Sequence, residues 1–284
     1  MKRKISISFF SIAIAILFGL ACILAIYPLW HVIVGSLISY PEYMQKVLML
    51  WPNRITFENY HYVLGQGTVL QPLVVTIFIT CVGTFVNVFM ITLAAYGLSK
   101  RFPGVKAISI LMIVTMFLSA GLIPSYILFR QLGILNSVWV YILPAMINPF
   151  YVIIMRTSFL DFPSELEEAV AIDGAGKFVT FLRVVLPLSK PTLVTIGLFT
   201  AVDYWNTFRE SVYFVTDSSK KTLQDFLYMV MNNTNMGAMG TGQAIVTENV
   251  KLAYTALAII PILMVYPVLQ NHMASGIMVG SVKG

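Results

Sequence analysis

Apolar residues gather into six long runs along the chain. The runs extend over about 9–34, 72–98, 107–129, 135–155, 191–214 and 252–269, and five of the six contain no Lys, Arg, Asp or Glu. Runs of this length cross roughly 30 Å of hydrocarbon as helices, because each backbone N–H and C=O has to find its partner within the same segment. The pattern therefore predicts an all-α, polytopic membrane protein with six transmembrane helices.

The composition supports a membrane protein. Of the 284 residues, 58% are hydrophobic and only 11% are charged, whereas about a quarter of the residues in soluble domains are charged. A soluble fold could not bury so much apolar surface, and we expect residues 1–284 to form a single transmembrane domain. Cys22 and Cys81 both lie within apolar runs, where a thiol acts as a small apolar side chain, so neither a metal site nor a disulfide is indicated.

The first run follows Lys2, Arg3 and Lys4, a basic start that is also typical of secretory signal peptides. The run is too long for a signal peptide, and we expect it to remain as a span. With the N-terminus in the cytoplasm, the inner segments carry eleven of the eighteen Lys and Arg residues, as the positive-inside rule requires. We therefore place both termini in the cytoplasm and attribute the net charge of +6 to membrane orientation rather than to a nucleic-acid partner.

The segment between the fourth and fifth runs has a pattern of its own. Ser164 and Glu167 have the spacing of a capping box, in which each side chain accepts a hydrogen bond from the backbone N–H of the other residue. Acidic residues fill the first turns, where the helix dipole favours negative charge, and Gly174 can take the positive φ that ends a helix. We predict a helix over about 165–173, a glycine turn and a second helical pattern that enters the membrane at Leu186-Pro187. Such a short helix is marginal in water, so its apolar side needs a packing partner.

This pattern resembles the cytoplasmic signature of permeases from binding-protein-dependent ATP-binding cassette (ABC) importers. The signature is Glu-Ala-Ala, three residues, Gly, nine residues and Ile-x-Leu-Pro. The chain has Glu168-Ala169-Val170, Gly174 and Val184-Val185-Leu186-Pro187 at the same spacing. The two departures, Val170 and Val184, exchange small or branched apolar residues for one another. An ordinary amphipathic linker between two spans would not require this spacing.

Further matches resemble the carbohydrate-importing branch of the family, to which the smaller permease subunit of the maltose transporter belongs. They include Ile172-Asp173-Gly174-Ala175, Trp205-Asn206 and the stretch from Leu186 to Pro191. The tail from Gly276 to Gly284 is similar to permeases for complex oligosaccharides such as oligouronides. The resemblance covers most of the chain after about Pro72.

The resemblance implies the fold of a type I ABC importer permease. Residues 162–190 would form a cytoplasmic coupling loop, whose first helix docks on a separate ATPase subunit. The residues that it implies for this contact are Glu167, Glu168, Ala169, Asp173, Gly174, Ala175, Leu186 and Pro187. The plainer alternatives are a solvated carboxylate at a helix start for Glu168 and a simple helix stop for Gly174.

The resemblance also implies partners. The sequence has no Gly-x-x-x-x-Gly-Lys-Ser/Thr phosphate loop, so we expect no cofactor on this chain and no enzymatic activity of its own. ATP and Mg would be bound by two ATPase subunits. A second homologous permease, an extracellular or periplasmic solute-binding protein, an oligosaccharide substrate and the lipid of a bacterial inner or plasma membrane complete the expected surroundings.

Two charged residues of the fifth run are candidates for the substrate path. Charge within a membrane costs roughly 2.5–3.5 kcal/mol or more, so an ionisable residue there suggests a function. Asp203 either faces a polar sugar path or lies near the outer interface, where water reaches it, because the run is interrupted near Trp205-Asn206. Arg209 can attract a carboxylated sugar.

Uncharged polar and aromatic residues are further candidates for this path. Asn87, Asn148 and Asn206 can hydrogen-bond sugar hydroxyls, and Trp205 can stack on a sugar ring. The alternative for each is structural, because polar side chains within spans also tie helices together.

A different class of function remains open at this point, namely a secondary transporter or channel for small polar solutes that works alone. Such proteins usually place ionisable relays or broken helices at the midplane, and apart from Asp203 the sequence shows no relay. A membrane enzyme is less well supported, because His31, His61 and His272 are scattered and no catalytic constellation gathers around them.

Overall fold

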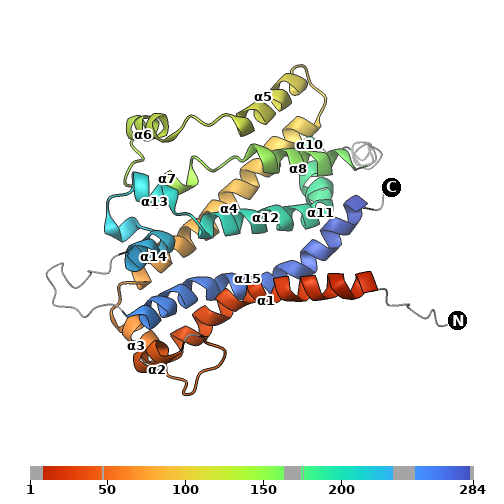
Figure 1. Cartoon of the computed structure of the whole chain (residues 1–284). Helices are drawn as coiled ribbons and strands as arrows, with labels where there is room; N and C mark the ends of the chain where they lie inside the picture. Colours follow the sequence, from red (N-terminus) through yellow and green to blue (C-terminus); the bar gives the residue numbers. More distant parts are fainter. Residues whose placement is uncertain (1–8, 47, 163–173, 175, 233–246, 282–284) are drawn as a thin grey trace. The chain divides into compact units, whose positions relative to one another are not determined.

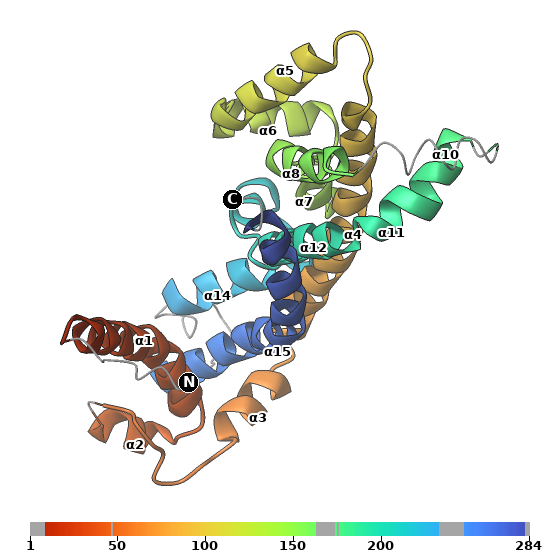
Figure 2. The same cartoon turned by 90° about the vertical axis from the view of Figure 1, so that its right-hand side faces the viewer.

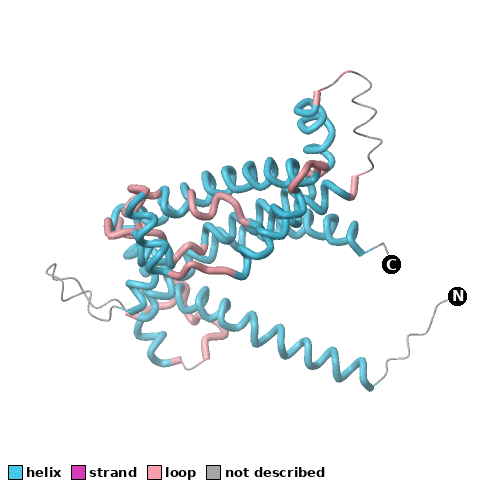
Figure 3. Tube along the Cα trace, turned by 90° about the horizontal axis from the view of Figure 1, so that it is seen from above, coloured by secondary structure: helices cyan, strands magenta, loops and turns pink. Residues whose placement is uncertain are grey.

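The computed structural model describes residues 9–46, 48–162, 174, 176–232 and 247–281, and of residues 9, 11 and 265–281 it describes the backbone alone. Within these ranges the chain forms helices joined by loops and contains no β-strand (Figure 3). The all-α class predicted from the apolar runs is confirmed.

The chain divides into two compact units, and Figure 1 labels the helices. In chain order they are α1 (Phe9–Ser36), α2 (Tyr40–Gln45), α3 (Glu58–Gly65), α4 (Leu70–Ser99), α5 (Val105–Phe117), α6 (Leu122–Gln131), α7 (Trp139–Ile142), α8 (Pro149–Leu160), α10 (Lys177–Thr180), a π-helical turn (Phe181–Val185), α11 (Leu186–Leu188), α12 (Lys190–Trp205), α13 (Arg209–Phe214), a 3₁₀ turn (Ser218–Lys220), α14 (Leu223–Asn232) and α15 (Glu248–Ser281). The first unit comprises Met1–Val69 and Leu227–Ile260, and the second comprises Leu70–Phe226 and Pro261–Gly284.

Two helices among the described residues are long and apolar enough to cross a membrane. They are Ile12–Ser36 within α1 and the whole of α4, with mean hydropathies of 2.6 and 2.3. Two bent pairs qualify if each pair is one broken span: α5 with α6, bent by 117°, and Lys177–Leu188 with α12, bent by 76°. The described residues therefore provide two to four spans, and the six spans expected from the sequence stay a prediction.

The expected spans differ from the observed helices in where they break. The run at 107–129 is divided between α5 and α6, because Gly121 takes a φ of +84° between them. Pro124 has no N–H to donate to a carbonyl of the preceding turn, so α6 cannot continue from α5 through this position. The run at 135–155 is divided as well, since α7 is only four residues long and α8 starts afresh after Asn148. By contrast, the backbone of α15 passes without a break through the run at 252–269.

A buried polar network holds the first unit together. Asn59 of α3 donates from Nδ2 to the carbonyl oxygens of Ser36 and Ile38, at 2.9 and 2.8 Å. Its Oδ1 accepts from Nδ2 of Asn249, at the start of α15, at 2.9 Å. Buried carbonyl groups need such donors, because an unmade hydrogen bond in a dry interior is costly. The network therefore fixes the end of α1 against α3 and α15.

Replacing Asn59 with alanine should destabilise the first unit by about 1–3 kcal/mol, because three buried hydrogen bonds are lost at once and only Asn249 and the Ile38 carbonyl keep a bond, to each other. The midpoint of thermal unfolding of the purified protein in detergent should fall. The control is Asn232→Ala, which removes one exposed hydrogen bond to the Tyr228 carbonyl and should leave the midpoint nearly unchanged. Equal midpoints for the two variants would contradict the importance of the network.

α4 is the central helix of the second unit, and α8 and α12 lie along it (Figures 1 and 2). Apolar side chains bury against α4 in two places. One cluster surrounds Val75 and Ile79 near its start, and the other surrounds Ile91 and Ala95 near its end. Burial of this kind stabilises helix contacts by roughly 25 cal/mol per Å² of apolar surface. Asn87 lies between the two clusters in the sequence of α4, and its side chain contacts Thr200 of α12 and the connection between α7 and α8.

Candidate functional site

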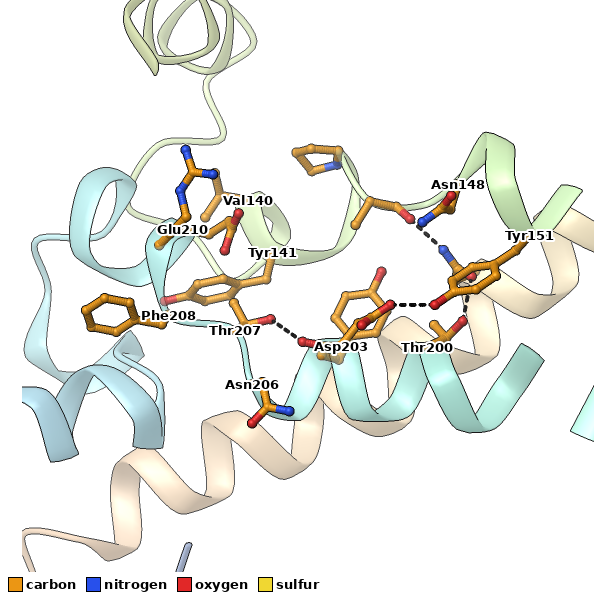
Figure 4. Close-up of a pocket in the computed structure, with 15 residues that line it drawn as sticks. Val140, Tyr141, Asn148, Tyr151, Thr200, Asp203, Asn206, Thr207, Phe208 and Glu210 are labelled. Atoms are coloured by element: carbon orange, nitrogen blue, oxygen red, sulfur yellow. Dashed lines mark hydrogen bonds between the residues drawn. The ribbon is translucent and has the colours of Figure 1, made fainter. Parts of the chain in front are cut away.

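A cavity of about 420 Å³ lies in the second unit (Figure 4). Its lining comes from α4, from α7, α8 and the connection between them, and from the end of α12 with the start of α13. This volume falls within the range of about 300–1,000 Å³ that is typical of small-molecule sites. Five of the six residues predicted for the substrate path line it, namely Asn87, Asn148, Asp203, Asn206 and Arg209. The sixth, Trp205, does not line the cavity, and only 8% of its surface is exposed.

Asn87 ties three segments together at the cavity wall. Its Nδ2 donates to the Ala145 carbonyl at 2.5 Å, and its Oδ1 accepts from the Thr200 hydroxyl at 3.1 Å. The side chain is buried, with 3% of the residue surface exposed. These contacts fit the helix-tying role that we considered as the alternative for asparagines within spans.

Asn148 and Asn206 stand at helix ends. Asn148 is the N-cap of α8, and its Oδ1 accepts from the N–H of Phe150 at 3.0 Å. Asn206 follows the last residue of α12 and donates from Nδ2 to the Val202 carbonyl at 2.9 Å. Asn148 thus satisfies an N–H that the start of α8 would otherwise leave without a partner, whereas the Val202 carbonyl also accepts from the backbone N–H of Asn206 at 3.0 Å.

Asp203 and Tyr151 form a hydrogen-bonded pair at the cavity (Figure 4). The Tyr151 hydroxyl, from the first turn of α8, donates to Oδ2 of Asp203 at 2.9 Å. The Tyr151 ring also stacks almost parallel to Phe199, with centroids 6.5 Å apart and an interplanar angle of 4°. Asp203 is exposed, and in the described ranges it takes part in no ion pair. The carboxylate is thus held in place at one oxygen, while the other is left for a ligand.

Sequence reasoning missed Tyr151. An aromatic residue within an apolar run carries no local sign of a polar partner, and its partner here is 52 positions away. The sequence does carry a weak signal for Tyr151. A carboxylate within a membrane needs a hydrogen-bond donor, and the hydroxyl of a tyrosine in a neighbouring span can provide one.

Tyr204 positions the end of α12 that carries Asp203. Its ring lies directly against Gly83 of α4, so closely that a Cβ atom added at Gly83 would be 2.6 Å from Tyr204 Cζ. Tyr204 is only 4% exposed, and its hydroxyl lies 3.5 Å from the Ile142 carbonyl. Glycine at position 83 therefore permits the close approach of α4 and α12 on which the cavity wall depends.

Arg209 and Glu210, the first two residues of α13, complete the charged lining. Both also line a second cavity of about 150 Å³, to which Ser119 and Ser125 contribute. Arg209 is exposed and is in no ion pair within the part of the chain that the structure describes. The two cavities thus share a guanidinium group that can receive an anionic ligand.

Comparison with known proteins identifies the family. No family profile matches the chain. It is 38% identical over 275 residues to the polygalacturonan/rhamnogalacturonan transport system permease protein YtcP of Bacillus subtilis (strain 168), with 95% of each chain covered. It is 40% identical over 266 residues to the protein LplC of the same organism, with 92% of this chain and 90% of LplC covered. The chain belongs to the permease family of carbohydrate-importing ABC transporters.

The solved structures agree with this assignment. The permease is similar to a chain from a bacterial ABC transporter involved in the import of the acidic polysaccharide alginate, with a TM-score of 0.87 and 30% sequence identity. The match covers 94% of this permease and 98% of that chain. The resemblance drawn from the cytoplasmic signature is confirmed, and the permease is a membrane protein and a transport subunit. Its relatives give no support to a transporter that works alone.

Of the coupling loop predicted over 162–190, the structure describes residues 162, 174 and 176–190, and the turn lies at Gly174. This residue has a φ of +78°, the positive value predicted for it. Leu186 and Pro187 lie in α11, directly before the 76° bend into α12, where Pro187 and Pro191 both lack an N–H for the helical ladder. The other predicted contact residues lie outside the described residues, as does the helix expected over 165–173; they are Glu167, Glu168, Ala169, Asp173 and Ala175.

Aromatic contacts connect the arm that follows Gly174 to α4, and α4 to α8. The ring of Tyr96, near the end of α4, lies 4.6 Å from the ring of Phe181 and 5.9 Å from that of Phe159. The Tyr96 hydroxyl donates to the Lys177 carbonyl at 3.4 Å, and Nζ of Lys100 lies 4.4 Å over the Tyr96 ring. The arm that follows Gly174 therefore contacts α4, the helix that carries Asn87, and the same Tyr96 ring contacts α8, the helix that carries Tyr151.

Proposed function

We propose that this permease and a second, homologous permease chain form the pathway of an ABC importer that takes up oligosaccharides with acidic sugars. The observation that carries the proposal is the gathering of Asp203, Arg209 and three asparagines around one cavity of ligand size. The functions of similar proteins support the acidic substrate, since one is a permease for polygalacturonan and rhamnogalacturonan and another belongs to an importer of alginate. A solute-binding protein outside the membrane delivers the sugar, and both termini lie in the cytoplasm.

In this proposal the energy comes from ATP and Mg bound to two separate ATPase subunits, because the sequence has no phosphate loop. The ATPase contact is made by the coupling loop, through Glu167, Glu168, Ala169, Asp173, Gly174, Ala175, Leu186 and Pro187. The positive φ of Gly174 and the packing of the following arm on α4 support this role. A moving loop can then act on the helices at the cavity.

The proposal is tested with cells that express the complete importer with or without this permease. Uptake of a radiolabelled acidic oligosaccharide should require the permease, and an ATPase subunit should co-purify with it from detergent extracts. Uptake of neutral oligosaccharides alone would overturn the acidic substrate. Purification without any ATPase would overturn the coupling role.

Arg209→Gln should lower the uptake of an acidic oligosaccharide by about tenfold, because the lining of the cavity loses its positive charge for the sugar carboxylate. Uptake of a neutral oligosaccharide that the importer also accepts should change little. Arg130→Gln is the matched control, since Arg130 of α6 lines neither cavity. A parallel loss of both kinds of uptake in Arg209→Gln would point to a structural role for the arginine.

A further inference from the structure

A helix of only six residues carries the arginine of the candidate site. Arg209 and Glu210 are the first two residues of α13, and both line the two cavities. So short a helix is not stable by itself, so its orientation depends on the contacts that it makes with the rest of the fold. Its buried residues are Ser211 and Phe214. The place of the guanidinium group therefore depends on what holds Ser211 and the residues just before α13.

Thr222 binds the chain on both sides of Arg209. Its hydroxyl donates to the Thr207 carbonyl at 2.8 Å, and its backbone N–H donates to Ser211 Oγ at 3.2 Å. Thr207 lies two residues before Arg209, and Ser211 lies two residues after it. Thr222 and Ser211 are both fully buried. One residue thus holds both ends of the short segment that carries the arginine.

Asp225 strengthens the hold on α13. Its Oδ2 accepts from Ser211 Oγ at 2.8 Å and from Nζ of Lys221 at 2.9 Å. Only 2% of Asp225 is exposed, and a buried charge needs such partners because it has lost its water. Hydrogen bonds to an ionised group are stronger than those between neutral groups, so the Ser211 hydroxyl is held firmly.

The same turn is anchored to the central helix of the second unit. Thr222 comes directly before α14, and the N–H of Leu223, the first residue of α14, donates to Oγ1 of Thr76 on α4 at 2.8 Å. Thr76 is fully buried. Since α4 also carries Asn87 at the larger cavity, one helix fixes both this asparagine and the chain around Arg209.

We propose that residues 221–225 act as a clamp that positions Arg209 at the two cavities. Ser211 and Thr222 are then positioning residues, although neither lines a cavity. This inference rests on the proposed function, in which Arg209 receives the carboxylate of an acidic sugar. A side chain that is already in place loses little freedom when its ligand binds, so such positioning raises affinity. Loss of the clamp should therefore weaken the binding of an acidic sugar and leave the later steps of transport unchanged.

The first test measures the position of residue 209 without any substrate. A spin label is attached to Arg209→Cys in the complete importer, in which all native cysteines have been replaced. The label should be ordered in this parent and become markedly more mobile when Ser211→Ala or Thr222→Val is added. Ser36→Ala is the matched control, because Ser36 is equally buried and its hydroxyl also makes two hydrogen bonds, but it lies in the first unit. Unchanged mobility in both clamp variants would overturn the inference.

The second test uses transport and asks whether the clamp acts through Arg209. Ser211→Ala should raise the KM for uptake of an acidic oligosaccharide about fivefold, because one side of the clamp loses its hydrogen bonds. The maximal uptake rate should stay the same, as should the KM for a neutral oligosaccharide that the importer also accepts. Thr222→Val should act in the same direction, which keeps the test decisive if Ser211→Ala does not assemble. In a permease that already carries Arg209→Gln, neither substitution should raise the KM further, since residues that act as a unit are not additive.

The outcomes separate this inference from the proposed function. A further rise of the same size on top of Arg209→Gln would mean that the clamp supports the fold in general, and it would overturn the inference. If Arg209→Gln itself leaves the uptake of acidic sugars unchanged, the carboxylate-binding role in the proposed function fails. The mobility of the label then still decides whether the clamp holds residue 209 in place.

Discussion

Gly83→Ala is expected to lower the stability of the permease markedly and to abolish most of its transport. The added methyl group would lie 2.6–2.8 Å from three atoms of the Tyr204 ring, far inside van der Waals contact. The ring cannot swing aside easily, because Tyr204 is buried and its hydroxyl is near the Ile142 carbonyl. Overpacking of this kind typically costs about 1–3 kcal/mol. The midpoint of thermal unfolding and the uptake rate at equal membrane levels would measure the two effects.

Gly97→Ala is the matched control for this variant. Gly97 belongs to the same helix, but nothing lies within 4 Å of an added Cβ, so alanine should be neutral or slightly stabilising there. A second arm combines Gly83→Ala with Tyr204→Leu, which removes the ring and should recover part of the loss, because contacting residues are not additive. If Gly83→Ala and Gly97→Ala unfold at the same temperature, the close contact of α4 with α12 is not what holds the cavity wall.

The fold was predictable from the sequence as far as the apolar runs go. α1 and α4 follow two of the expected spans closely, because a run without charged residues or breaks in a membrane has no alternative to a helix. The breaks were harder to see. Gly121, followed shortly by Pro124, and Asn148, followed by Pro149, are recognisable stop and start signals. Run length alone hides such signals, since a single residue hardly changes the average hydropathy.

The sequence indicates which residues are candidates for the site, but it does not predict the contacts that these residues make. The sequence indicates Asp203, Arg209 and the asparagines as candidates, because polar side chains in apolar surroundings are costly and suggest a function. The structure brings these residues to one cavity. Their individual roles depend on tertiary packing. Asn87 bonds the Ala145 carbonyl 58 positions away, and Trp205 lies outside the cavity although it is adjacent to residues that line it. Neighbours in a helix point about 100° apart, so adjacency in sequence does not predict a shared face.

In the predicted coupling segment, by contrast, the local backbone conformation was predictable from a single residue, Gly174. A residue takes a positive φ most readily when it has no Cβ, and Gly174 has a φ of +78°. Among the described residues, none has an atom within 4 Å of a Cβ added at Gly174. Within this part of the chain, only the backbone conformation requires glycine at this position.

Gly174→Val should consequently reduce uptake to about a tenth or less, because an L residue with a positive φ costs about 1–2 kcal/mol and a β-branched one costs more. Gly174→Asn is the matched control. Asparagine tolerates this conformation, so uptake should remain close to that of the wild type even though the new side chain is of similar size. Uptake and co-purification of the ATPase are measured together in both variants. Loss of transport in Gly174→Val alone supports a backbone turn that couples the permease to its ATPase. Equal losses in both variants would mean that the surface around residue 174 must stay bare, and unchanged transport in both would remove this turn from the coupling mechanism.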